Sequence, residues 1–231
     1  VDIWSDVRCP FCYIGKRKFE QALEKFPHKE QVEVKWHSFE LDPKLETDPG
    51  SNTLEYFTRT KGVSTDQARQ MFGHATQMAK DVGLEFYLED AVPANSFNAH
   101  RLIQLAKTKS LGDAAEEALF KAHFTEKKNI DDKEVLKSIG ISLGLNKIEV
   151  EEVLASVAFE EEVKKDQMEA KKIGVQGVPF FVLNNKYGIS GAQSSEVFLE
   201  TLEKAWEEYS RSNPSLIVTQ GDNCSIDGNC K

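Results

Sequence analysis

The distribution of hydrophobic and polar residues along the chain changes its period twice. Residues 1–4 form an apolar run of β type, and apolar and charged residues alternate at a period of two over 32–36, as in a half-buried strand. Between these runs, apolar residues recur at helical spacing over 14–26 until Pro27 ends the run. This opening part of the chain is therefore predicted to be a βαβ unit.

The middle of the chain, residues 45–173, has helical periodicity almost throughout, which an alternating βαβα chain would not show. Ser64 and Gln67 have the spacing of a capping box. A predicted helix with one apolar face, from Met71 onward, follows them and ends at Gly83. We expect about five or six helices in this part of the chain.

The pattern changes again at Gly174. Two short β runs flank Asn184 and Asn185, and they are predicted to form a hairpin because asparagine tolerates the positive φ of tight turns. A last amphipathic helix precedes the tail. We therefore divide the chain into one domain made of residues 1–44 and 174–212, an inserted helical domain of residues 45–173, and a C-terminal tail of residues 213–231.

The composition argues against several classes of partner. The 231 residues suffice for a full core, and the net charge of −9 disfavours nucleic acids and anionic membranes, which are met by clustered Lys and Arg. No apolar run reaches the roughly 18 residues of a membrane span, and no signal peptide is visible. We expect a soluble, cytoplasmic protein. Because the chain starts at Val1 without a methionine, its N-terminus is expected to be incomplete or processed.

The candidate chemistry lies in Cys9-Pro10-Phe11-Cys12, between the first β run and the first predicted helix. A sulfur at a helix start faces unpaired N–H groups and the positive end of the helix dipole, which favour thiolate over thiol. Pro10 fits an early helical position, where its missing N–H costs nothing. Cys9 is therefore the candidate nucleophile and Cys12 the candidate resolving thiol, with Pro10 and Phe11 completing the motif.

Two questions concern the cysteines: whether the C-x-x-C motif binds zinc, and what Cys224 and Cys230 do. A lone C-x-x-C is also a zinc half-site, but Cys224 and Cys230 are too widely spaced to supply the second half, and the five histidines form no H-x(3–5)-H pair. We therefore predict no metal. Within their polar tail, Cys224 and Cys230 could form a disulfide with each other, a second redox pair or an anchor for the tail.

Three motifs, taken together, resemble those of a known family. They occupy residues 5–15, which contain C-P-F-C, residues 93–102, and residues 174–180. With the helical insertion, the chain looks like the DsbA family of thioredoxin-fold oxidoreductases from its start to about Trp206, and more closely like the FrnE-like branch of that family. The resemblance implies an α/β, thioredoxin-like fold (βαβ…ββα) with a large α-helical insertion domain.

The resemblance also implies a second half of the site. Pro179 is expected to be a cis-proline that faces the cysteine pair, although it lies far from that pair in sequence. The backbone of Val178 would then be free to pair with an extended substrate segment. The alternative for Pro179 is an edge proline at the start of a strand.

Other residues in the matching motifs carry weaker implications. For Asn95 and His100, a helix cap and a hydrogen-bonded structural histidine are the simpler interpretations, and we assign catalysis to neither. FrnE-like proteins can carry a further cysteine pair near the C-terminus. Electron relay between Cys224 and Cys230 and the first cysteine pair is therefore a hypothesis.

The leading functional hypothesis is a thiol–disulfide oxidoreductase or disulfide isomerase acting on protein or peptide disulfides, which needs no metal or organic cofactor. Glutathione, another small thiol or a thioredoxin-type protein would be its electron partner. The alternative is a glutathione-dependent transferase or isomerase of the kappa-class or 2-hydroxychromene-2-carboxylate isomerase type. Those relatives usually have Ser at the position of Cys9 and lack the second thiol. A chaperone-like binding module is the third hypothesis.

For the oxidoreductase hypothesis, the identities of Pro10 and Phe11 do not fix the direction of electron flow.

Overall fold

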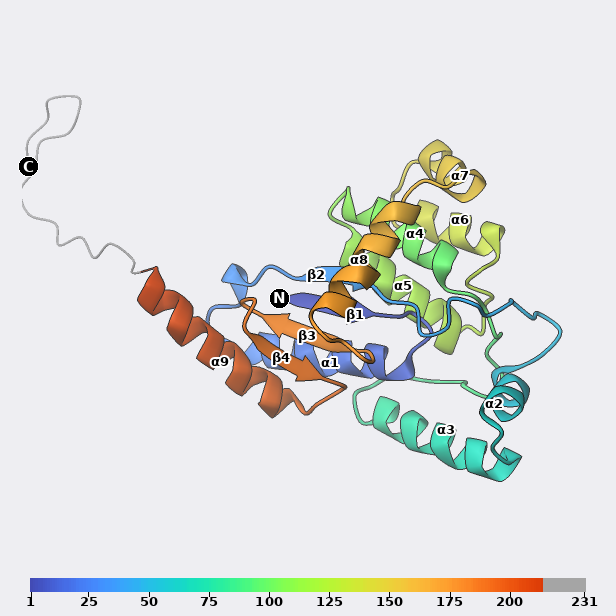
Figure 1. The fold of residues 1–231 in the computed structure, drawn as a ribbon, viewed down its shortest axis with the longest axis horizontal. Coiled ribbons are helices and arrows are strands. Elements are labelled where there is room, and N and C mark those ends of the chain that lie inside the picture. The colour runs from blue at the N-terminus through green and yellow to red at the C-terminus, as the bar shows by residue number, and fades with distance from the viewer. Residues whose placement is uncertain (214–231) are drawn as a thin grey trace, which may run out of the picture.

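The computed structural model describes residues 1–213, so that Cys224 and Cys230 lie outside the described residues. The chain forms a strand, a helix and a second strand, then a long series of helices, two further strands and a last helix (Figure 1). The elements are β1 (Asp2–Ser5), α1 (Pro10–Lys25), the 3₁₀ helix η1 (Lys29–Gln31), β2 (Lys35–Ser38), α2 (Thr53–Lys61), α3 (Thr65–Lys80), α4 (Phe97–Lys107), α5 (Gly112–Phe124), α6 (Lys133–Ser142), α7 (Lys147–Ala155), α8 (Glu160–Lys172), β3 (Phe180–Leu183), β4 (Tyr187–Ser190) and α9 (Ser195–Ser212).

The strands form one sheet in the order β2-β1-β3-β4. β1 pairs in parallel with β2 and antiparallel with β3, so that Ile3 lies between Trp36 and Phe181. β3 and β4 form the predicted hairpin, and Asn184 and Asn185 have φ of 51° and 54° in its turn. The chain therefore has the predicted βαβ…ββα order, with the helical insertion α2–α8 between β2 and β3.

The two faces of the sheet are covered by different helices. Because successive residues of a strand point to opposite faces, Ile3 packs with Phe181 on the side of α1 and α9, whereas Trp4 packs with Ala170 of α8. Figure 1 shows α1 and α9 on one side of the sheet and α8 on the other. A separate apolar core inside the insertion also packs against the start of α1, through Tyr13 and Ile14.

Helix α5 of the insertion is held against α1 and β2 by polar contacts. The Tyr13 hydroxyl donates to Oε1 of Glu117 at 2.6 Å, Nζ of Lys16 lies 3.3 Å from Oδ2 of Asp113, and Nε1 of Trp36 donates to Oδ1 of Asp113 at 3.0 Å. Burial favours neutral Lys16, but Asp113 and Glu20 outweigh burial and raise the pKa of Lys16. These contacts fix the position of α5 beside the start of α1.

Some boundaries differ from the prediction. The described residues contain seven helices between β2 and β3 rather than five or six. β2 begins at Lys35, whose N–H bonds to the Val1 carbonyl at 2.8 Å, and not at Val32, because η1 occupies the residues before it. The capping box of Ser64 is present as predicted, but Met71 on the predicted apolar face of α3 is exposed.

A charged cluster joins the sheet to the insertion. His37 in β2 lies between two carboxylates: Nε2 is 2.8 Å from Oδ1 of Asp2, and Nδ1 is 3.1 Å from Oδ1 of Asp166 in α8. The ring also stacks on Trp4. Burial alone would lower the pKa of His37, but the bonds to Asp166 and Asp2 raise it, against the opposing charge of Lys107. The protonated imidazole therefore links β2 to α8.

This cluster predicts a pH dependence of folding. Because the pKa of His37 is raised in the folded state, the stabilisation is complete below the unfolded pKa of about 6.5 and is lost as pH rises through the folded pKa. The contribution of Asp166 to stability changes with pH in the opposite direction, because its pKa is lowered in the folded state. Asp166 is therefore ionised throughout the range above pH 5 and adds no change there. Urea unfolding of His37→Gln should show a loss of about 1–3 kcal/mol at pH 5.5 and a smaller loss at pH 9. A pH-independent loss, or the same profile for exposed His74→Gln, would contradict this assignment.

Among residues 1–213, none of the helices combines the length and the apolar character needed to cross a membrane.

Candidate active site

Cys9 and Cys12 lie at the start of α1, directly after β1. Cys9 is the N-cap residue and Pro10 occupies the first helical turn, as predicted. The turn that leads into the helix is closed by two backbone hydrogen bonds, Cys9 N–H to Asp6 O at 2.8 Å and Cys12 N–H to Cys9 O at 3.0 Å. Both cysteines are free thiols. The first sulfur therefore stands at the positive end of the helix dipole.

The fold brings Val178 and Pro179 to this helix start. The Val178–Pro179 peptide bond is cis, as the family resemblance implies, and the Cys9 thiol donates to the Val178 carbonyl at 3.5 Å across 169 positions of sequence. Among residues 1–213, no hydrogen-bond acceptor pairs with the Val178 N–H. The backbone beside Cys9 therefore keeps a free donor.

Gly15 allows this close approach. A Cβ atom at Gly15 would lie 3.0 Å from Cγ of Pro179 and 3.4 Å from the ring of Phe181. A hydrogen in place of the side chain lets the proline ring rest on the first turns of α1. The packing of Pro179 on α1 thus holds the segment before β3, which contains Val178, close to Cys9.

The two thiols differ in environment. Both residues are buried, with 4 % of Cys9 and 1 % of Cys12 exposed, but burial and the neighbouring Cys9 raise the pKa of Cys12 well above its usual value, against the smaller influence of Asp6 and Ser5. Cys12 is thus a thiol at neutral pH. Phe11, between the two cysteines, is exposed at the helix start.

Three buried polar side chains lie near the cysteines: Asp6, Glu116, and His100, for which a structural role is expected. Asp6 accepts the Leu41 N–H at 2.8 Å, and Nε2 of the fully buried His100 is 3.6 Å from Oδ1 of Asp6. Burial opposes both charges, but this pairing lowers the pKa of Asp6 and raises that of His100. Ser5 donates to Oε2 of Glu116 at 3.4 Å. The buried pair of Asp6 and His100 and the buried acid Glu116 thus lie beside the end of β1 that leads to the cysteines.

One signal in the sequence could have identified Glu116. It lies four residues before Phe120 and seven before His123, so the three share one helix face, and all three are buried. An acid on an otherwise core-facing stripe is unusual because a buried charge needs a partner. The partner, in contrast, comes from β1 and could not be read from the helix.

The motif at residues 93–102 makes hydrogen bonds within the helical insertion. Oδ1 of Asn95 accepts the Phe97 N–H at 2.8 Å at the start of α4, and its Nδ2 donates to the Leu45 carbonyl at 3.0 Å. Arg101 donates through Nε to the Ala158 carbonyl at 2.8 Å, beyond the end of α7. Asn95 therefore organises the helix start from one residue before the N-cap, which is Ser96 and not Asn95 as the cap interpretation expected.

In the part of the chain that the structure describes, one group has the spacing of metal ligands, namely His37, Asp166 and Glu169, whose ligand atoms lie within 4.8 Å of one another. The group includes neither Cys9 nor Cys12. Asp166 already accepts the Ser38 N–H at 2.8 Å and the Gln104 amide at 2.6 Å. These donors fit an ion-pair network better than a metal site.

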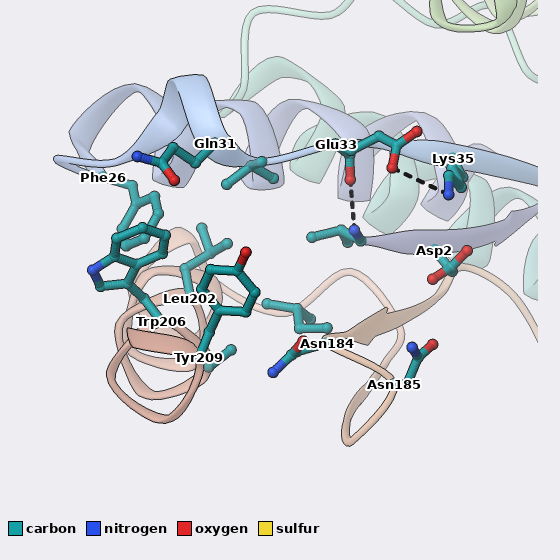
Figure 2. Close-up of a pocket in the computed structure, with 14 residues that line it drawn as sticks. Asp2, Phe26, Gln31, Glu33, Lys35, Asn184, Asn185, Leu202, Trp206 and Tyr209 are labelled. Carbon is teal, nitrogen blue, oxygen red and sulfur yellow. Dashed lines mark hydrogen bonds and ion pairs between the residues drawn. The ribbon is translucent and has the colours of Figure 1, made fainter. Parts of the chain in front are cut away.

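A groove of about 290 Å³ lies away from the thiols, between α9, the segment before β2 and the hairpin turn (Figure 2). In Figure 2, Trp206 of α9 lies beside Phe26 at one end of the groove, and Asp2 and Asn185 lie at the other end. Its lining includes Asp2 at the start of β1, whereas Cys9 follows the end of that strand. The groove is therefore not part of the thiol site.

Comparisons with known proteins agree with this fold. The family model of the DSBA-like thioredoxin domain matches residues 1–203. A probable DsbA oxidoreductase, SCO1869 from Streptomyces coelicolor, is 38 % identical, with a TM-score of 0.86 over 100 % of this chain and 97 % of that one. The uncharacterized protein YwbO of Bacillus subtilis (strain 168) is 26 % identical over 86 % of this chain and 92 % of its own length. A 2-hydroxychromene-2-carboxylate isomerase is 18 % identical, with a TM-score of 0.63 over 92 % of this chain and 96 % of that one, which shows a shared fold alone.

Proposed function

The chain belongs to the family of DSBA-like thioredoxin domains, and from this premise we propose that it exchanges thiols and disulfides with protein or peptide substrates. In this proposal Cys9 is the nucleophile and Cys12 the resolving thiol. One observation carries the proposal: the Cys9 thiol lies 3.5 Å from the Val178 carbonyl, beside the cis bond to Pro179. The candidate nucleophile Cys9 and the backbone of Val178, whose N–H has no partner among residues 1–213, are thus next to each other.

The exchange proceeds in two displacements. The thiolate of Cys9 attacks one sulfur of a substrate disulfide, a bond forms between them, and the other substrate sulfur leaves as a thiolate. Cys12 then attacks Cys9, which forms the Cys9–Cys12 disulfide and releases the first substrate sulfur. The substrate is reduced and the protein is oxidised by the same two electrons, and the reverse sequence oxidises a dithiol.

Val178 would position the substrate. An extended peptide can add to an exposed backbone edge as a strand does, with main-chain hydrogen bonds giving affinity without sequence preference. The free Val178 N–H is the donor for such pairing. Exposed Phe11 and Leu41 would contact side chains of the bound segment. This arrangement favours protein or peptide disulfides over small disulfides alone.

The test combines trapping with a redox titration. Cys12→Ser should accumulate a mixed disulfide between Cys9 and a disulfide-bonded peptide, detected as added mass that dithiothreitol removes. The Cys9–Cys12 couple of the unmodified protein is then equilibrated with glutathione. A couple more reducing than the glutathione pool would assign reductase or isomerase work, and a strongly oxidising couple would assign disulfide donation. No adduct at any pH between 6 and 9 would refute the proposal.

We also propose that the chain belongs to the FrnE-like branch, on the motifs at residues 5–15, 93–102 and 174–180 together, and that glutathione, another small thiol or a thioredoxin-type protein is its electron partner. A glutathione-dependent isomerase is less well supported because Cys9 and Cys12 are both present. A chaperone-like module is also less well supported, since most apolar side chains of the insertion are buried in its core.

A further inference from the structure

A second groove, of about 490 Å³, lies between helix α3 and the segment 86–90 that follows it. The chain reverses after α3, where the Leu84 N–H donates to the Ala79 carbonyl at 2.9 Å. Near the start of α3, Nε of Arg69 lies 3.3 Å from Oε2 of Glu89. The segment therefore runs back along the helix (Figure 1). We call this space the α3 groove.

One wall of the α3 groove carries backbone groups without a partner. Buried and exposed side chains alternate over residues 84–88, as in an extended chain. The Tyr87 N–H donates to the Phe124 carbonyl at 2.8 Å, on the side of α5. Because neighbouring residues of an extended chain direct their backbone groups to opposite sides, those of Phe86 point away from α5. Among residues 1–213, neither the N–H nor the carbonyl of Phe86 has a hydrogen-bond partner, and Phe86 lines the groove.

The opposite wall contains a glycine that packing within the chain does not require. Gly73 lies in the interior of α3, is exposed and lines the groove. Glycine is among the least favourable residues in a helix interior. In the part of the chain that the structure describes, a Cβ atom at Gly73 would meet no atom within 4 Å. A partner whose backbone closely approaches the helix would account for glycine at this position.

The length and lining of the α3 groove suit an extended peptide. It reaches from Arg69 to Lys80, about 16 Å along the helix axis, which matches about five residues of an extended chain. Phe72 and Leu88 add apolar surface between the two ends. Arg69 is already paired with Glu89, whereas Lys80 forms no ion pair among the described residues. The groove therefore favours a segment with apolar side chains at alternate positions and a carboxylate near Lys80.

We propose that the α3 groove binds an extended segment of the substrate polypeptide while Cys9 exchanges with a disulfide elsewhere in the same substrate. This inference rests on the proposed function. The bound segment pairs with the Phe86 backbone and passes over Gly73. The Phe86 ring stacks on Tyr13 of α1 with 5.8 Å between centroids, so the groove lies beside the helix that carries the cysteines. The substrate class is thus a long, unfolded polypeptide rather than a short peptide disulfide.

Binding is measured without exchange, in a protein that carries Cys9→Ser and Cys12→Ser. The probe is a fluorescent, cysteine-free peptide of alternating valine and threonine with one glutamate, and anisotropy gives its Kd. Gly73→Trp should weaken binding about tenfold or more, because the indole fills the groove. Gly73→Ala should weaken it about threefold, with a melting midpoint no lower than that of the unmodified protein.

The contribution of charge is tested with the same probe. Replacing its glutamate with glutamine should weaken binding about two- to fivefold, and Lys80→Gln should abolish this difference between the two peptides. A difference that persists in Lys80→Gln would show that the carboxylate does not lie near Lys80 and would overturn the assigned orientation of the segment.

His74→Trp is the matched control, because His74 is exposed on the same helix and does not line the groove. It should bind the probe as the unmodified protein does. If Gly73→Trp does not fold, Gln77→Trp replaces it, since Gln77 is exposed and lines the groove. In the protein with both thiols, Gly73→Trp should raise KM for an unfolded, disulfide-bonded polypeptide about tenfold, leave kcat unchanged, and leave exchange with a short peptide disulfide unchanged.

The outcomes separate this inference from the proposed function. Unchanged probe binding in Gly73→Trp, or in Gln77→Trp where Gly73→Trp does not fold, would overturn the role of the α3 groove while leaving disulfide exchange intact. A dimer of the unmodified protein that Gly73→Trp dissociates would assign the groove to a second copy of the chain and would also overturn it. Failure of Cys12→Ser to form any mixed disulfide, with probe binding retained, would overturn the exchange reaction itself.

Discussion

Replacing Cys9 with serine is expected to lower the rate of disulfide exchange by roughly 1000-fold or more, because a serine hydroxyl does not ionise near neutral pH and cannot form a disulfide. No other thiol is available to replace it: among residues 1–213 the other cysteine is Cys12, whose pKa is raised well above the usual value, so that it stays a thiol at neutral pH. The measurement is the rate of reduction of a fluorescent peptide disulfide by protein at pH 7 with glutathione as donor.

The folded state of Cys9→Ser is the necessary control. Serine keeps the shape of the side chain with one atom exchanged, so Cys9→Ser should remain folded, which far-UV circular dichroism and the melting midpoint check. Full activity of Cys9→Ser would show that the disulfide mechanism is wrong. It would favour the glutathione-dependent isomerase alternative, since serine usually occupies this position in those relatives.

Replacing Phe181 with alanine is expected to lower the free energy of unfolding by about 3–5 kcal/mol, as for other large aromatic side chains removed from a core. Phe181 is fully buried, packs against the tilted ring of Phe19 and edge-to-face with Phe198, and contacts Gly15 of α1. The cavity would therefore open between the sheet and the helix that carries the cysteines. Urea unfolding followed by far-UV circular dichroism gives the value.

Phe180→Ala provides the comparison, since Phe180 is the neighbouring residue of β3 on the opposite face and is only partly buried. Its loss should be clearly smaller than that of Phe181→Ala. Equal losses for the two variants would show that the core between α1, α9 and the sheet is not what stabilises this unit.

The parts of the fold that depend on local pattern could be predicted from the sequence. The helix after Cys9, the capping box at Ser64 and the Asn184–Asn185 turn each depend on a few neighbouring residues, and all are present. The start of β2 could not be predicted in the same way. Its register depends on a hydrogen bond between Lys35 and Val1, which periodicity within the strand does not contain.

The residues of the candidate site likewise fall into those that the sequence indicates and those that only the fold brings together. Cys9 and Cys12 are visible as a motif, whereas Pro179 was connected to them through the family resemblance because no local rule joins such distant positions. Asp6 and Glu116 were not singled out at all. Their roles depend on how α4 and α5 pack behind β1, and this packing is a property of the assembled fold.

The contact between Cys9 and Val178 also sets an order of events during biosynthesis. The residues that supply the two sides of the site are 169 positions apart, and β3 must pair with β1 before they meet. A ribosome adding about 5–20 residues per second needs on the order of ten seconds or more to deliver the second half after the first. During that interval the nascent chain carries the cysteine pair without its backbone partner, and the helices of the insertion have time to form first because their contacts are local. The reactive site is thus completed late, after most of the scaffold around it exists.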